Sequence, residues 1–152
     1  MKIILTIVLT LSVSACASGS AIRTSQNSAI IQAAAAPVCG GIGAAQVAQQ
    51  QAAIETLRAG YDRYVVTSGA SENNVRVSYV PGSATTYGTV YGNSVHMNTT
   101  YQPQTMVSGN HSQSLNIVMF KDGDVGAANA ISAREVLGPK WAELVKKGIT
   151  TC

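Results

Sequence analysis

The residues best suited to chemistry in this 152-residue chain are three cysteines, Cys16, Cys39 and Cys152. A thiol can accept a lipid, bind a metal or form a disulfide, whereas hydrolysis requires a nucleophile beside a base. The two imidazoles, His96 and His111, lie in sequence rich in Ser, Thr and Asn. Neither G-x-S-x-G nor S-x-x-K occurs, so we expect no enzymatic activity and no catalytic residue.

Metal binding is equally poorly supported by the spacing of the possible ligands. Asp122 and Asp124 are the one close pair among seven acidic residues, and D-x-D can begin a calcium loop. Gly126 and Ala127 then occupy the fifth and sixth loop positions, and no Glu follows at the twelfth. A turn between a strand and a helix explains the two aspartates better. The cysteines and histidines lack zinc-site spacing, so we expect no metal and no cofactor.

The N-terminal segment has the pattern of an export signal. Lys2 precedes an apolar run over residues 3–11, which is too short to span a hydrocarbon core of roughly 30 Å. The next residues resemble the lipobox of bacterial lipoproteins, in which an aliphatic residue and two small residues precede a cysteine: Val13, Ser14, Ala15 and Cys16. This resemblance implies a signal peptide over residues 1–15 and lipidation of Cys16. The alternative is an ordinary signal peptide in which Cys16 is incidental.

Lipidation would fix the location of the chain. Two or three acyl chains, each burying many methylenes at about 0.8 kcal/mol apiece, hold a protein firmly on its membrane. Ala17 follows the cysteine where, by resemblance to enterobacterial lipoproteins, an aspartate would favour retention in the inner membrane. We therefore expect a lipid-anchored protein of the outer membrane that faces the periplasm.

The other two cysteines are expected to pair. If Cys16 carries lipid, Cys39 and Cys152 are the remaining thiols in an oxidising compartment. One lies just before the first expected helix and the other is the last residue, and the ends of a domain often approach each other. An intramolecular disulfide fits this placement, although a bridge between two chains through Cys152 remains an alternative.

The composition indicates one small domain behind a tether. Residues 17–36 contain Ser, Ala, Gln, Asn and Thr with Arg23 as the single charge, which predicts a lipidated flexible tether over 16–36. Pro37 and the two glycines at 40 and 41 then mark the start of a single α+β domain over 37–152.

Apolar periodicity and turn residues predict the elements of this domain. The expected helices are 44–58, 127–137 and a third that begins at Pro139, and the expected strands are 62–67, 75–79, 85–91, 94–101 and 113–121. Turns are expected at 73–74, 81–82 and 92–93, and Pro103 is expected to end a strand. The strand at 113–121 is apolar on both faces in its second half and is the candidate central strand. Together these predict a mostly antiparallel sheet of four to five strands with one N-terminal helix and a C-terminal helical pair against it.

The region from Val77 to Phe120 contains no Lys, Arg, Asp or Glu. Interface cores are depleted in charge and rich in tyrosine, and an uncharged edge strand invites pairing with another strand. The candidate protein-binding residues here are Tyr87, Tyr91 and Tyr101. The alternative is a Thr- and Tyr-rich hairpin that extends the sheet for its own stability and has no partner.

Residues 60–64 and 121–141 resemble small uncharacterised proteobacterial envelope lipoproteins, a resemblance that implies no activity. Loss of Lys2 with the signal would leave nine of ten basic residues against seven acidic ones, so we expect no nucleic-acid partner. The sequence thus predicts an envelope lipoprotein held by its acyl chains and acting on an envelope protein as a scaffold, assembly factor or sensor. An exported small-ligand binder and an exported hydrolase are the alternatives.

Overall fold

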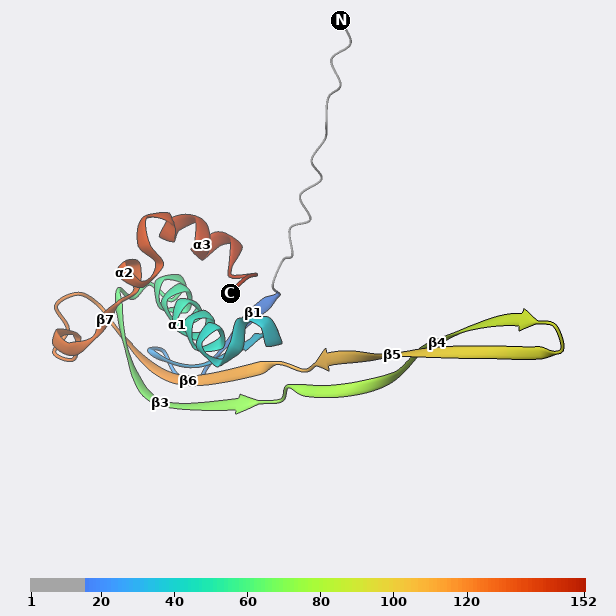
Figure 1. Cartoon of the computed structure of the whole chain (residues 1–152). Helices are drawn as coiled ribbons and strands as arrows, with labels where there is room; N and C mark the ends of the chain where they lie inside the picture. Colours follow the sequence, from blue (N-terminus) through green and yellow to red (C-terminus); the bar gives the residue numbers. More distant parts are fainter. Residues whose placement is uncertain (1–15) are drawn as a thin grey trace, which may run out of the picture.

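A computed structural model describes residues 16–152 as an α+β domain from which a long β-hairpin projects (Figure 1). The predicted signal peptide, including the lipobox residues before Cys16, lies outside the described residues. The domain contains a five-stranded antiparallel sheet in the order β1-β2-β6-β3-β7. Its strands are β1 (Ala17–Arg23), β2 (Ser28–Ala35), β3 (Arg63–Asn73), β6 (His111–Phe120) and β7 (Ile131–Ser132). The position of β6 in the middle of the sheet confirms the prediction of a central strand there.

Helix α1 (Gly40–Arg58), which follows the short helix η1 (Pro37–Cys39), covers one face of this sheet (Figure 1). It confirms the predicted N-terminal helix and begins four residues earlier. Its alanine-rich face lies close to the sheet because small side chains permit a short distance between helix and strands. The core between the two layers is completed by large side chains that are at most 1% exposed: Ile31, Val47, Ile54, Tyr64, Ile117 and Met119.

The C-terminal helical pair is α2 (Ala133–Leu137) and α3 (Trp141–Lys147), separated by the short helix η3 (Gly138–Lys140). The prediction of a helix over all of 127–137 was wrong in its first half, which forms η2 (Ala127–Asn129) and then β7. Ile131 and Ser132 pair with β3 instead, and the Ser132 hydroxyl accepts a hydrogen bond from the Glu135 amide at 3.5 Å, which caps α2. The pair packs mainly on α1, where the Arg58 guanidinium donates to the Val145 carbonyl at 2.6 Å.

The prediction of a flexible tether over 16–36 was wrong, because β1 and β2 occupy this segment. β1 pairs with β2, and β2 pairs along its whole length with the central strand β6. Alternate residues of β2 are at most 4% exposed and point toward α1: Ala29, Ile31, Ala33 and Ala35. The domain therefore includes residues from Ala17 onward, twenty residues before the predicted boundary at Pro37.

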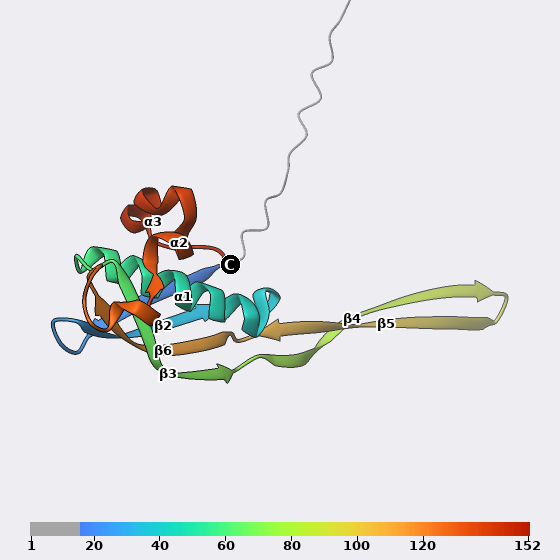
Figure 2. The ribbon, with the colours of Figure 1, turned by 90° about the vertical axis from the view of Figure 1, so that its left-hand side faces the viewer.

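Strands β4 (Arg76–Tyr91) and β5 (Ser94–Ser108) form the projecting hairpin, which we call the arm (Figures 1 and 2). The arm continues β3 and β6 without a change of register: Asn73 pairs with His111, and three residues further along each strand Arg76 pairs with Ser108. The turns predicted at 73–74 and 81–82, and the strand end predicted at Pro103, were therefore wrong. The chain passes position 81–82 as a β-bulge between Val80 and Ser83.

The predicted turn at Gly92 and Asn93 is confirmed as the tip of the arm. Tyr91 pairs with Ser94 across it, and Gly92 has a φ of 56°, which suits the first central position of a type II′ turn. A strand is confirmed within the predicted range 75–79, and its residues in β4 are exposed because no other element covers them.

Candidate protein-binding arm

The arm is exposed on both faces. Every residue of β4 and β5 is exposed except Gly82, which is intermediate. Within residues 16–152 these strands form a separate two-stranded sheet and pair with no third strand. An isolated two-stranded hairpin is marginally stable at best in water, so an arm of this length carries surface that a partner would stabilise.

Cross-strand pairs divide the arm into two faces, because paired residues share a side and neighbours along a strand alternate. One side, which we call the apolar face, carries Val77, Tyr79, Ala84, Gly88, Val90, Val95, Met97, Tyr101, Pro103, Thr105 and Val107, together with Thr86 and Thr99. One of the Thr86 and Thr99 hydroxyls donates a hydrogen bond to the other at 2.9 Å. The other side, the polar face, carries Ser78, Ser83, Thr85, Tyr87, Thr89, Tyr91, Ser94, His96, Asn98, Thr100, Gln102 and Gln104, with Val80 and Met106 nearer the base.

The three tyrosines predicted to form a binding surface lie on the arm, but they do not share a side. Tyr87 and Tyr91 lie on the polar face and are 71% and 74% exposed. Tyr101 lies on the apolar face, where its hydroxyl accepts a hydrogen bond from the Gly82 amide at 3.1 Å. The tyrosines thus define two surfaces rather than one.

The apolar face continues the side of the sheet that α1 covers. Leu115 and Ile117 of β6 point into the core, and the same alternation along the chain leads to Val107 of β5. Val107 lies beside Pro37 and Val38 of η1 and lines with them a shallow hollow of about 430 Å³. Beyond η1 no described helix lies over this face, so an apolar surface leaves the domain and remains uncovered along the arm (Figure 2).

Cys16 lies at the same end of the sheet as the base of the arm. One row of paired residues crosses the sheet there, from Ala17 through Ala35 and His111 to Asn73. The Cys16 carbonyl accepts a hydrogen bond from the Ala36 amide at 3.1 Å. The backbone of Cys16 also forms an isolated antiparallel β-bridge with that of Thr151. The predicted site of lipidation therefore lies directly on the folded domain, with no spacer between them.

The predicted disulfide is confirmed: Cys39 and Cys152 are bonded, with their Cα atoms 6.0 Å apart. It joins the N-terminal end of α1 to the last residue of the chain. The neighbouring Thr150 carbonyl accepts a hydrogen bond from the Ala17 amide at 3.0 Å. The bridge therefore fastens the C-terminal segment beside Cys16.

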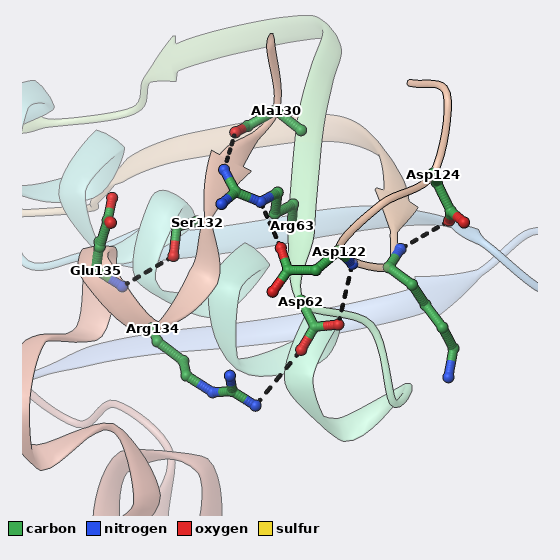
Figure 3. A network of polar contacts seen from close by, with 9 residues as sticks. Asp62, Arg63, Asp122, Asp124, Ala130, Ser132, Arg134 and Glu135 are labelled. Atoms are coloured by element: carbon green, nitrogen blue, oxygen red, sulfur yellow. Dashed lines mark hydrogen bonds and ion pairs between the residues drawn. The ribbon is translucent and has the colours of Figure 1, made fainter. Parts of the chain in front are cut away.

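The polar residues at the other end of the domain form a network that stabilises turns (Figure 3). Arg63 donates to the Asp122 carboxylate at 2.6 Å, and this carboxylate raises the pKa of Arg63. The Asp124 carboxylate accepts from the Lys121 amide at 2.8 Å, while Asp62 accepts from the Asp122 amide at 3.2 Å. The Arg63 guanidinium and the Lys121 amide thus occupy the Asp122 and Asp124 carboxylates that a calcium loop would need, in agreement with the predicted turn. Among residues 16–152, no group of three His, Cys, Asp or Glu side chains is placed to hold a metal.

The two histidines are not brought together, because His96 pairs with Thr89 near the tip of the arm and His111 pairs with Asn73 at its base.

The face of the sheet away from α1 carries an open hollow of about 680 Å³, lined by small and polar residues that include Ser18, Gln32 and Glu72. In the described part of the chain, every buried side-chain nitrogen or oxygen has a hydrogen-bond partner. No helix within residues 16–152 is long and apolar enough to cross a membrane.

The missed features of the site had partial signals in the sequence. Residues 29–35 form an apolar run that only Gln32 interrupts, which is compatible with a buried strand, but the run does not alternate and alanine has a low β propensity, so the strand was missed. Comparisons of the chain with protein-family models, with curated proteins and with solved structures found no match.

Proposed function

We propose that this chain is a lipid-anchored envelope protein of the outer membrane, facing the periplasm, which acts through protein contacts made by its arm. The observation that carries the proposal is the arm itself, which is long, uncharged from Val77 onward and exposed on both sides. Its role is that of a scaffold, an assembly factor or a sensor, without catalysis.

Three properties of the arm favour a protein as its partner. Its strand edges offer backbone donors and acceptors to another strand, and no charged side chain opposes pairing between Val77 and Ser108. Tyr87 and Tyr91 supply large contact area with few rotatable bonds. The residues that could give an alternative activity are engaged in the turn network or are separated along the arm.

The position of Cys16 supports anchorage close to the membrane. Acyl chains on Cys16 would attach at the residue just before β1, so the base of the arm would lie near the lipid surface. The resemblance of residues 13–16 to a lipobox supplies the reason for lipidation. A domain held in this way would present its arm at a defined height in the envelope.

Site-specific photocrosslinking tests the proposal. A photoreactive phenylalanine analogue is placed at Tyr87 or Tyr101 of the arm, and at exposed Lys140 of the domain as the control, in the full-length protein in a bacterial envelope. We expect protein adducts from the arm positions and few from Lys140. If neither arm position gives a protein adduct, although the Cys39–Cys152 disulfide has formed, the arm is not a protein-binding element.

A further inference from the structure

We infer that the partner of the apolar face is a second copy of this chain, so that two arms pack face to face; this inference rests on the proposed function. Apolar and polar side chains alternate along most of the arm; the exceptions are Val80 and Met106 on the polar face and Thr86, Thr99 and Thr105 on the apolar face. Pairing at the strand edges alone would not require this alternation. A layer packed on one side of the hairpin requires it, since side chains of alternate residues then fill the space between two sheets.

Two identical arms would not repel each other electrostatically. No charged residue lies between Val77 and Ser108, so two copies of the same face approach each other without the repulsion that like charges produce. One of the Thr86 and Thr99 hydroxyls donates to the other, so this pair brings a single hydroxyl donor into the contact, which the same pair of the second copy can accept. Val90 and Val95 face each other near the tip and form, with Met97, an apolar cluster at the outer end of the surface.

The area of the face is sufficient for a specific contact. A strand of 16 residues is about 50 Å long at roughly 3.3 Å per residue, and two strands with their side chains are about 10 Å wide. Face-to-face packing would thus cover about 500 Å² on each copy, or about 1,000 Å² in total, which is about the minimum area of a biological interface and corresponds to a weak contact in solution. Packing of this face on its own copy would give a dimer with twofold symmetry, in which both copies contribute the same residues to the contact.

Anchorage would align the copies. Cys16 and the base of the arm belong to the same end of the sheet, so copies held by lipid at Cys16 would carry their arms at one height. Confinement to a membrane surface raises the effective concentration of one arm beside another. This favours a second copy over a rare partner as the occupant of the apolar face.

A matched pair of lysine variants tests the inference. Val90→Lys and Thr89→Lys change neighbouring exposed residues of β4 and add the same charge, but Val90 lies on the apolar face and Thr89 on the polar face. Full-length copies carrying two different affinity tags are expressed together, solubilised in detergent and purified through one tag. We expect the second tag to co-purify with the wild type and with Thr89→Lys, and to fall at least about tenfold with Val90→Lys, since a buried unpaired lysine is costly.

Folding is checked by the disulfide and by the thermal unfolding of the domain, and Val90→Met, which keeps an apolar side chain, should restore co-purification. Equal co-purification of both lysine variants would overturn the inference, as would the absence of co-purification in the wild type. If the wild-type arm instead crosslinks to a different protein, the copy-to-copy contact is wrong while the proposed function stands. If it crosslinks to lipid alone, both are wrong.

Discussion

Removal of the Cys39–Cys152 disulfide should cost this protein a large part of its stability. The bridge closes a loop whose ends are 113 residues apart in sequence. In the chain-entropy model a loop of this size stabilises the folded state by about 5 kcal/mol, against a net stability of roughly 5 to 15 kcal/mol for ordinary domains. We therefore expect the double variant Cys39→Ser with Cys152→Ser to fold marginally and to lose order first in the C-terminal segment.

The assay is urea unfolding of the full-length protein in detergent, followed by the fluorescence of Trp141, the single tryptophan, which packs against the core. A loss of about 5 kcal/mol corresponds to a fall of roughly 2 M or more in the urea midpoint of a small domain. Reductant should produce the same fall in the wild type and no further change in the double variant, which controls for other effects of the reductant.

Hydrogen exchange adds a local measurement. The Ala17 amide, which donates to the Thr150 carbonyl, should exchange faster once the bridge is absent. If the oxidised and reduced wild type have the same urea midpoint, the argument is refuted. The disulfide would then not lower the conformational entropy of the unfolded chain enough to affect stability.

Three further predictions concern single residues. Burial raises the pKa of Tyr64 to about 12. Between about pH 10 and 12 the phenol therefore loses its proton in the unfolded chain but keeps it in the folded one, and the free energy of unfolding falls by on the order of 2 to 3 kcal/mol. Tyr64→Phe should show a smaller loss of stability at alkaline pH. At neutral pH it should cost about 1 kcal/mol, because the Tyr64 hydroxyl donates to the Gln49 carbonyl at 3.2 Å. Urea unfolding at several pH values measures both effects. Cys16→Ser should release the exported protein from the membrane fraction, and continued membrane sedimentation would count against lipid anchorage. Gly109→Ala should reduce hydrogen-exchange protection in the arm but leave the Trp141 unfolding midpoint nearly unchanged, because Gly109 has a φ of 99° and its added methyl would meet the Asn74 carbonyl oxygen.

The elements that sequence alone predicted well are those whose signals are local. Helix α1 follows from an alanine- and glutamine-rich segment without proline, and the apolar strand β6 follows from its composition. The tip of the arm was predictable because Gly92 and Asn93 suit a two-residue turn. The Cys39–Cys152 pairing was predictable because the expected lipidation of Cys16 leaves these two as the remaining thiols.

Other features of the candidate site depended on contacts between distant segments. The charge-free composition of the arm and its tyrosines were visible in the sequence, but the turns expected at 73–74 and 81–82 concealed that β4 continues from β3 in the same register. Without that register, Tyr87 and Tyr101 could not be assigned to opposite faces. The bulge between Val80 and Ser83 shifts β4 by one residue, and a shift of one residue moves side chains from one face to the other.

The sequence by itself determined the fold class, the central strand, the first helix and the residues that form the bridge. Tertiary structure decided that residues 17–35 are strands rather than a tether, because Ala29 and Ala33 gain their stability from burial between α1 and β6 rather than from strand propensity. It also decided that the apolar face of the arm is uncovered. Alternation in a sequence predicts that one face of a strand will be buried, but only the positions of α1 and η1 show where that cover ends.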